Sequence, residues 1–180
     1  GAFFGTLVSD SLCLGSHYEY DAPTIKKAYG GLIEEFMAPG EKLGGQTHGV
    51  GWGRRNYHPG QMKGGQTDYG LYNVLMLEYL ASRKDPAKPV DLKELIPVWK
   101  RRINSDWGAW VCSMTRTTMQ QIQEGVPYDA LGGNSNAMSM RSAAAHAVWR
   151  DEASIEQAVR SFMFTHRNKE ALGGALFFAK

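Results

Sequence analysis

Two carboxylates in the first twenty residues are the first side chains that could do chemistry. Asp10 lies in an apolar segment, between Val8 and Leu12. A carboxylate in such a segment either accepts hydrogen bonds from backbone N–H groups or faces a polar cavity, because burying its charge is otherwise costly. A functional role and a structural cap explain Asp10 about equally well. Glu19 follows where a first helix should give way to a loop, and surface exposure is its slightly favoured interpretation.

A threonine and an aspartate at positions 67 and 68 form the second candidate. They follow Gly64 and Gly65 at the start of a predicted helix. Hydroxyl and carboxylate oxygens placed together there suit a hard cation or a phosphate-bearing ligand. A helix N-cap with an acidic first turn explains Thr67 and Asp68 without any ligand, and the sequence alone favours this alternative by roughly two to one.

A turn of glycine and asparagine at 132–136 is the third candidate. It contains Ser135 and Asn136 and leads into a predicted helix that carries Arg141. The backbone N–H groups at such a helix start could bind an anion, although simple capping would also use asparagine here. His166, in a turn after Thr165, is the fourth; a lone histidine in a turn is usually a cap or a surface residue, so it indicates no function by itself.

Helices are the elements that must position these residues. Leucine and valine recur at spacings of three and four over 68–83, with Thr67 as the N-cap. Capping and stop residues predict further helices over 91–103, 107–124, 134–149 and 154–164, and from 168 onwards. Pro97 either kinks the first of these or marks its true first turn. Ser154 and Gln157 read as a capping box, and Asn168 as a cap. Glycine recurs from 30 to 65, which predicts a long irregular loop.

Composition limits the fold and the partners. The 180 residues are 43% hydrophobic and 21% charged, which is typical of one ordinary globular domain. Few β-branched residues alternate, so we predict an all-α fold. A net charge of +2 argues against direct nucleic-acid binding, and no apolar run is long enough to span a membrane. Cys13 and Cys112 lack a metal or disulfide pattern, which predicts buried, reduced thiols in a soluble intracellular protein of cytoplasm or organelle.

The order of these segments resembles the ADP-ribosylglycohydrolase family, and more narrowly its branch of J1 crystallins. The segments that carry the resemblance are 5–12 (GTLVSDSL), 14–21 (LGSHYEYD), 57–60 (YHPG), 66–70 (QTDYG), 136–141 (NAMSMR), 165–166 (TH) and 171–175 (ALGGA). It spans nearly the whole of 1–180, which we therefore predict to be a single domain. The sequence opens and closes inside apolar runs, so we expect the fold to be incomplete at both ends, with its C-terminal part outside this sequence.

The resemblance implies an orthogonal helical bundle with a cleft for two magnesium ions and ADP-ribose. Members cleave the bond between the ribose and a protein side chain or a small leaving group, so the implied partners are an ADP-ribose-like molecule or an ADP-ribosylated protein. Carried over by position, Thr67 and Asp68 would bind metal, and Glu19 or Asp10 would be catalytic. The implied substrate-binding residues are Asn136, Ser135, His166 and Arg141.

Two departures from the family pattern leave the activity open. Active members follow the threonine with two acidic residues, whereas Tyr69 follows Asp68 here, and a second aspartate-rich cluster has no counterpart in this sequence. Two adjacent divalent cations need several anionic oxygens. Either the chain is a magnesium-dependent hydrolase completed by an additional C-terminal part, or it is a non-catalytic J1-crystallin-like relative, structural or part of a larger complex. The two are near even, with lost or altered catalysis slightly favoured. A third alternative, an unrelated helical interaction module, would use the eight methionines and five tryptophans as a binding surface.

Overall fold

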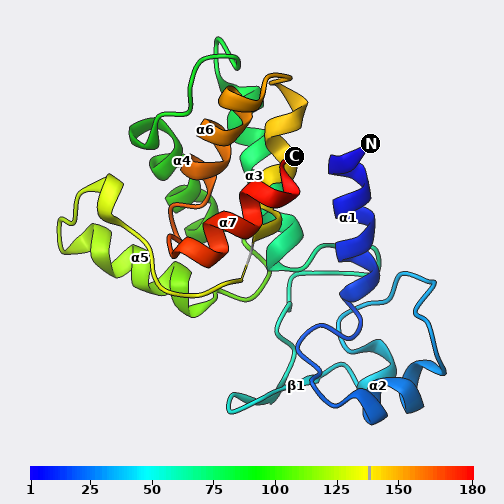
Figure 1. Ribbon diagram of the computed structural model, residues 1–180. Helices are drawn as coiled ribbons and strands as arrows, with labels where there is room; N and C mark the ends of the chain where they lie inside the picture. Colours follow the sequence, from blue (N-terminus) through cyan, green and yellow to red (C-terminus); the bar gives the residue numbers. More distant parts are fainter. Residues whose placement is uncertain (138) are drawn as a thin grey trace. The chain divides into compact units, whose positions relative to one another are not determined.

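The described part of the chain forms two compact units. The computed structural model describes residues 1–137 and 139–180. Unit 1 comprises Gly1–Phe3, Tyr72–Asp106 and Val111–Lys180, and unit 2 comprises Phe4–Leu71 and Trp107–Trp110. Most described residues are helical and their one sheet has two short strands (Figure 1), which confirms the predicted all-α class. The assignment of 1–180 to a single domain stays a prediction.

Unit 2 contains most of the amino-terminal helix and a loop-rich segment. Helix α1 spans Ala2–Cys13 and α2 spans Ala22–Tyr29, followed by a short 3-10 turn, η1, at Glu41–Leu43. Strands β1 (Thr47–Gly49) and β2 (Gly53–Arg55) form an antiparallel hairpin. The predicted irregular loop over 30–65 is therefore wrong in part, because the hairpin and η1 are regular.

Helix α2 was not expected, although its sequence carries ordinary capping signals. The Asp21 carboxylate accepts a hydrogen bond from the backbone N–H of Thr24, and Pro23 lies in the first turn, where its missing N–H costs nothing. Gly30 ends the helix with a left-handed φ of 79°. Eight residues give too few turns for a clear apolar periodicity, which is why spacing alone overlooked this helix.

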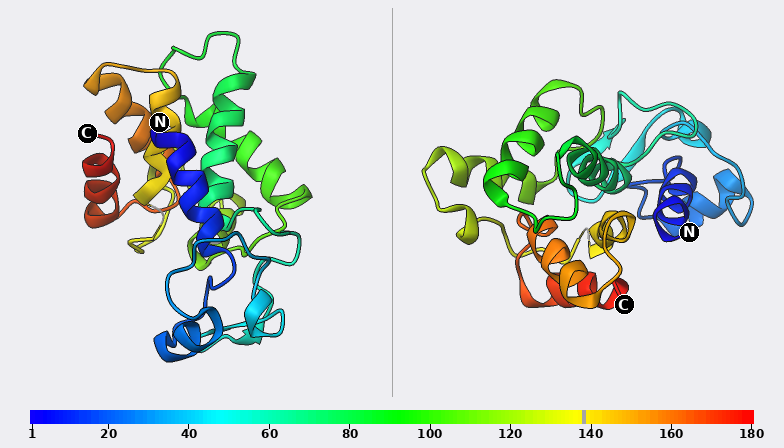
Figure 2. Two further views of the ribbon diagram at one scale, coloured as in Figure 1. Left: turned by 90° about the vertical axis from the view of Figure 1, so that its right-hand side faces the viewer. Right: turned by 90° about the horizontal axis from the view of Figure 1, so that it is seen from above.

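Unit 1 holds most of α3 and the remaining helices. Helix α3 spans Asp68–Ser82 and crosses from unit 2 into unit 1 at Tyr72. The elements that follow are α4 (Leu92–Ser105), α5 (Ser113–Gln123), η2 (Tyr128–Ala130), η3 (Ser139–Ala147), α6 (Glu152–Phe162) and α7 (Lys169–Phe178). Figure 2 shows α6 and α7, in orange and red, beside the yellow η3, and these three elements pack directly on one another.

The core of unit 1 is built from large side chains of α3 and α4 and from the end of α6. Trp99 is fully buried, and its ring meets the edge of Phe164 at a centroid distance of 5.1 Å. Tyr72, Leu75 and Phe162 are also almost completely buried. This packing supplies most of the stability of the helices, because isolated helices of this length are marginal in water.

Four predicted helices agree with the structure within two residues at the ends that were predicted. These are α3, α4, α6 and α7, which begin at Asp68, Leu92, Glu152 and Lys169. The side chains of Asp91 and Asn168 cap α4 and α7 as expected, accepting from the backbone N–H groups of Lys93 and Ala171. Pro97 lies inside α4 without ending it.

The predicted start of one helix is wrong, and so is the predicted cap of another. Helix α5 begins at Ser113 instead of 107, because Gly108 takes a left-handed φ of 66° and its carbonyl accepts a hydrogen bond from the Gly60 N–H. Helix α6 is capped by Asp151, which accepts from the Ser154 N–H at 2.8 Å. Gln157, expected in a capping box with Ser154, instead bonds both backbone groups of Val90.

The expected α-helix over 134–149 is also wrong in extent and type. Among the described residues of this segment, only Ser139–Ala147 are helical, and they form a 3-10 helix. Five consecutive residues, 141–145, are buried, so packing on several sides replaces the one-sided burial of an amphipathic α-helix. Met138 of this segment, and of the motif at 136–141, lies outside the described residues.

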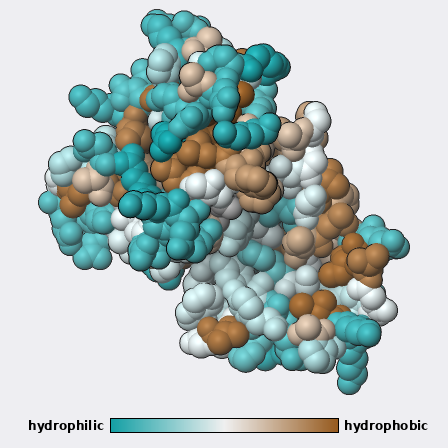
Figure 3. Space-filling model, viewed as in Figure 1, coloured by the Kyte–Doolittle hydropathy of each residue, from teal (hydrophilic) through white to brown (hydrophobic). Residues whose placement is uncertain are grey.

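The cysteines and the surface complete the fold. Both cysteines are free, as expected, but Cys13 is exposed and Cys112 half-buried, so their predicted burial is wrong. Cys13 is the last residue of α1, where Ser11 and Leu14 are the buried side chains instead. None of the described helices combines the length and apolar character that crossing a membrane requires. Apolar surface is visible around α6 and α7 (Figure 3), where Phe177 is 74% exposed.

Candidate functional site

Asp10 and Thr67 join α1 to the start of α3 within unit 2. The Asp10 carboxylate accepts hydrogen bonds from the Thr67 backbone N–H at 2.7 Å and from the Thr67 hydroxyl at 2.6 Å. Burial raises the pKa of Asp10, while the two bonds from Thr67 favour its charged form. Asp10 therefore meets the expectation that its carboxylate accepts backbone hydrogen bonds, and it acts as a bracket between two helices.

Gly70 and Gln66 support the contact between Asp10 and Thr67. A Cβ at Gly70 would collide with the Asp10 carboxylate and with Gln66, so only glycine lets α3 approach this closely. The Gln66 amide donates to the Leu7 carbonyl at 3.2 Å and to the Ser11 hydroxyl, whose own proton goes to a backbone carbonyl. The start of α3 is thus fixed against α1 by several bonds.

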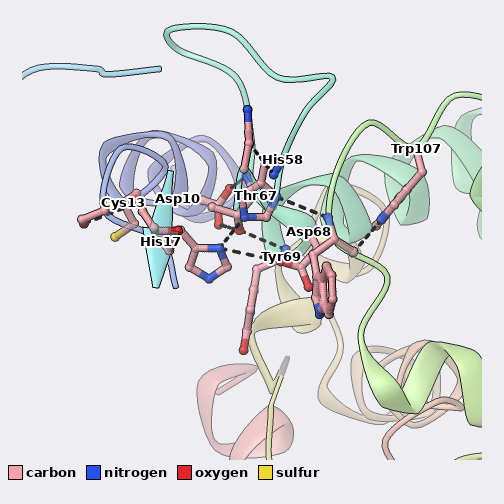
Figure 4. A network of polar contacts seen from close by, with 12 residues as sticks. Asp10, Cys13, His17, His58, Thr67, Asp68, Tyr69 and Trp107 are labelled. Carbon is pink, nitrogen blue, oxygen red and sulfur yellow. Dashed lines mark hydrogen bonds and ion pairs between the residues drawn. The ribbon is translucent and has the colours of Figure 1, made fainter. Parts of the chain in front are cut away.

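Asp68, next to this bracket, faces a pair of histidines in unit 2. His17 Nδ1 and His58 Nε2 share a hydrogen bond of 2.7 Å, and His17 Nδ1 is 3.9 Å from Asp68 Oδ1. Figure 4 shows the three side chains pointing toward one another from three separate segments. Asp68 and His58 are 0% and 1% exposed, whereas the His17 side chain is 20% exposed. One ligand atom from each of the three lies within 4.8 Å of the others, a spacing that one metal ion could span.

The hydrogen bonds define where the protons of the histidine pair lie. His58 Nδ1 accepts from the Trp110 backbone N–H at 3.4 Å, so His58 carries its proton on Nε2 and donates it to His17 Nδ1. Burial lowers the pKa of His17 to about 4 and that of His58 to about 3, with His17 adding to the effect on His58. Both imidazoles are therefore neutral near pH 7, beside the carboxylate of Asp68.

Aromatic rings of unit 2 surround the histidine pair. Tyr18 stacks on Tyr57 at 4.7 Å between centroids and is tilted against His17 at 4.4 Å. Its φ of 68° makes it the one described non-glycine residue with left-handed backbone, a costly conformation that tends to occur at functional sites. Trp52 and Trp110 stack at 6.2 Å nearby. These rings exclude water from one side of the cluster.

Glu19, the other expected catalytic carboxylate, is buried at 8% exposure, so the favoured surface position is wrong. Its two oxygens accept from the backbone N–H groups of His48, at 3.2 Å, and Asp21, at 3.3 Å. The N–H groups of β1 and of the turn before α2 would otherwise lack acceptors, which is the physical reason for the burial. Glu19 thus organises this part of unit 2.

Two expected substrate-binding residues lie in the interior of unit 1. Arg141 is 1% exposed, donates to the Thr165 hydroxyl at 2.6 Å and to the Phe162 carbonyl at 3.2 Å, and lies 3.9 Å from the Tyr72 ring centroid. His166 is fully buried, with Nδ1 2.8 Å from the Thr165 hydroxyl. The interpretation of His166 as a surface or capping histidine is wrong, because the turn that holds it is packed inside the unit.

Asn136 and Ser135 occupy the surface of unit 1. The Asn136 amide donates to the Glu170 carboxylate at 2.8 Å and accepts from the Asn168 amide at 2.7 Å, so it joins the loop to the start of α7. The Ser135 hydroxyl accepts from the Ala137 N–H at 3.3 Å. Each is bonded to nearby groups of the loop or of α7, and Asn136 is exposed.

A model of one protein family, described as ADP-ribosylglycohydrolase, matches residues 1–180. The chain belongs to this family. No curated protein and no solved structure matches the chain. Proteins of this family are in general metal-dependent hydrolases of ADP-ribose-type substrates, so membership suggests a hydrolase-type function for the chain.

The residues present do not fit the pair of magnesium ions that the resemblance implied for ADP-ribosylglycohydrolases. The Thr67 hydroxyl donates its proton to Asp10 and accepts from the Tyr69 N–H at 3.1 Å, and the Asp10 oxygens are occupied by Thr67. The Glu19 oxygens accept from backbone N–H groups, and the possible metal ligands grouped with Asp68 among the described residues are imidazole nitrogens instead of oxygens. Magnesium prefers oxygen ligands, so the donor set differs in kind.

His17 and His58 were not predicted to be members of the site. They lie in two of the segments that carry the family resemblance, 14–21 and 57–60, but 41 positions separate them, so the sequence does not indicate that they meet. Only the folding of the glycine-rich loop onto the ends of α1 and α3 brings them to Asp68. The sole local signal was two histidines beside tyrosines, as His17-Tyr18 and Tyr57-His58.

Buried His166 predicts a measurable pH dependence of stability. Burial, with the nearby charge of Arg141, lowers the pKa of His166 from 6.5 to about 3. As pH falls below 6.5, the unfolded chain binds a proton that the folded chain does not, so the free energy of unfolding falls with pH down to about 3. The His166→Asn variant keeps a polar atom for Thr165 but cannot take up a proton. Between pH 7 and pH 5 its free energy of unfolding, measured by urea titration, should fall by about 2 kcal/mol less than that of the wild type.

The matched control for this prediction is Thr117→Asn, at a half-buried threonine in α5 of the same unit. This change removes no titratable group, so it should leave the pH dependence as in the wild type. If the free energy of unfolding of the His166→Asn protein falls with pH as steeply as that of the wild type, His166 does not titrate as its burial requires.

Proposed function

We propose that the chain is a hydrolase of ADP-ribosyl or related N- or O-glycosidic bonds whose chemistry is centred on Asp68, His17 and His58. The observation that supports this most is a buried carboxylate facing two neutral imidazoles, at the position that the family resemblance assigns to a metal-binding aspartate. Burying a carboxyl group costs folding free energy, and titratable clusters perturbed by burial concentrate at active sites.

The three side chains would supply what glycosidic hydrolysis requires. Water bonds to the anomeric carbon of the ribose, the glycosidic bond breaks, and positive charge develops on the sugar ring in the transition state. The Asp68 carboxylate would stabilise that charge, and the neutral imidazole pair would take up the proton that water loses. The leaving group gains a proton, so the reaction needs no further co-reactant.

Most of the other expected site residues would hold chain segments in place instead of taking part in the reaction. We propose that Asp10, Thr67 and Glu19 hold the segments of unit 2 that present the cluster, since their polar atoms are bonded to backbone or to one another. Arg141 and His166 would shape unit 1 from within. Asn136 and Ser135, on the surface of unit 1, remain the candidates for direct contact with phosphate or ribose. Free cysteines agree with an intracellular place of action.

The alternative is a non-catalytic J1-crystallin-like protein, structural or part of a larger complex. Tyr69 in place of the second acidic residue favours it, as does the engagement of Asp10, Thr67 and Glu19 in structural bonds. This alternative predicts that the chain is folded but releases no ADP-ribose from its substrates.

Release of free ADP-ribose tests the proposal. The purified chain is incubated with one peptide ADP-ribosylated on arginine through an N-glycosidic bond and another ADP-ribosylated on serine through an O-glycosidic bond, with divalent cations supplied. We expect release from at least one peptide, and none from the heat-denatured chain. Release from neither, by a chain shown to be folded by circular dichroism, would contradict the proposal and support the non-catalytic alternative.

A further inference from the structure

The cluster of unit 2 combines nitrogen and oxygen donors in the manner of a transition-metal site. His17 Nδ1, His58 Nε2 and Asp68 Oδ1 come from the loop after α1, the loop after β2 and the first turn of α3. The three atoms lie within 4.8 Å of one another (Figure 4), and the partly exposed edge of His17 leaves a path for an ion.

We propose that this cluster binds one divalent first-row transition-metal ion, such as Zn²⁺, through His17, His58 and Asp68, in preference to Mg²⁺. The inference rests on the proposed function only for the use of the ion, not for its binding. Of the two metal ligands that the family resemblance suggested, Thr67 and Asp68, the proposed site uses only Asp68.

The choice of metal follows from the donors. Two imidazoles and one carboxylate bind Zn²⁺ and iron or related ions well, whereas Mg²⁺ requires oxygen ligands and holds its water tightly. One carboxylate leaves one positive charge on the bound dication, which the aromatic surroundings tolerate better than the two dications of the family pattern. When bound, such an ion would lower the pKa of a water molecule and polarise a substrate oxygen. It would then replace the imidazole pair and Asp68 in activating water, because their donor atoms would be its ligands.

The structure also shows what ion binding must change. The proton that His58 Nε2 donates to His17 Nδ1 occupies the line between the two donor atoms. On metal binding, that proton moves to His58 Nδ1, and the weak 3.4 Å contact with the Trp110 N–H is given up. Two nitrogens on one tetrahedral ion lie roughly 3.3 Å apart, so the 2.7 Å pair must open by about half an ångström. The Asp68 Oδ1 atom, 3.9 Å from His17 Nδ1, must also come closer, so the partly exposed His17 ring and the Asp68 side chain both have to turn.

Equilibrium dialysis tests the proposal directly. The chain is prepared without a polyhistidine tag, stripped with chelator, and dialysed against Zn²⁺, Co²⁺ or Mg²⁺ alone. We expect one equivalent of Zn²⁺ or Co²⁺ to bind at least about 100-fold more tightly than Mg²⁺. Bound Co²⁺ should give the visible absorption bands of a nitrogen-ligated site.

Three variants separate the ligands from the rest of unit 2. His17→Gln and Asp68→Asn should each weaken Zn²⁺ binding by about 100-fold or more, while His48→Gln, at an exposed histidine of β1, should bind as the wild type. Equal affinities of the wild type for Zn²⁺ and Mg²⁺, or unchanged Zn²⁺ binding by Asp68→Asn, would overturn the proposal. Zn²⁺ binding without ADP-ribose release would refute only the proposed function, and release supported by Mg²⁺ alone would refute only the metal assignment.

Discussion

Replacement of Asp68 by asparagine is expected to lower the rate of ADP-ribose release by about 100- to 10,000-fold. The change removes the buried negative charge that faces His17 and His58 while keeping the shape of the side chain. Asparagine can neither stabilise a developing positive charge as a carboxylate does nor serve as a strong metal ligand. The loss should therefore lie mainly in kcat, measured by the initial rate of ADP-ribose release at saturating peptide.

The matched control is Asp91→Asn, at the exposed N-cap of α4 in unit 1. Asparagine also caps helices well, so this variant should keep both the stability and the activity of the wild type. An Asp68→Asn protein that turns over at the wild-type rate would remove Asp68 from the chemistry.

The second large effect is expected at the bracket between α1 and α3. Asp10→Ala leaves the N–H and hydroxyl of buried Thr67 without their acceptor, and each of these bonds involves a charged partner. Hydrogen bonds to charged groups contribute about 1.5–3 kcal/mol each, so the free energy of unfolding should fall by about 3 kcal/mol or more. Urea titration followed by tryptophan fluorescence measures it, with Trp52, Trp107 and Trp110 of unit 2 contributing to the signal beside the two tryptophans of unit 1.

A double-mutant cycle assigns this loss to the bracket. Combining Asp10→Asn with Thr67→Val should give a coupling energy of about 1–3 kcal/mol, because the two side chains bond directly. Combining Asp10→Asn with Thr117→Val, in α5 of unit 1, should be additive. A coupling near zero for Asp10 and Thr67 would mean that the bracket is energetically unimportant.

The sequence predicted elements whose signals are local. The side chains of Asp91 and Asn168 cap helices that begin at the next residue, because an N-cap needs only a short polar side chain before an apolar periodic run. Helix α5 was misjudged because its first expected turn is held instead by Gly60 and Gly108, a contact between distant positions. Nothing within 107–112 reveals that contact.

The candidate site likewise has contacts that the sequence could predict and contacts that it could not. The pairing of Asp10 with backbone donors could be foreseen, because a carboxylate in an apolar helix needs partners nearby. The meeting of His17, His58 and Asp68 could not, since it depends on how the glycine-rich loop folds back. Polar residues in turns were also misleading. Arg141 and His166 look available for a ligand in the sequence, but the 3-10 geometry of η3 and its packing on α6 and α7 bury both.

The position of bound ADP-ribose tests the central claim most directly. The chain has five histidines, of which His17 and His58 belong to the cluster and His48 and His146 lie elsewhere, so the imidazole resonances of an ¹⁵N-labelled sample form a set of internal reporters. During titration with ADP-ribose in the presence of Zn²⁺, with the Zn²⁺-loaded protein as reference, the account predicts that the resonances of His17 and His58 shift while those of His48 and His146 stay in place. Saturation with ADP-ribose that leaves His17 and His58 unchanged would contradict it.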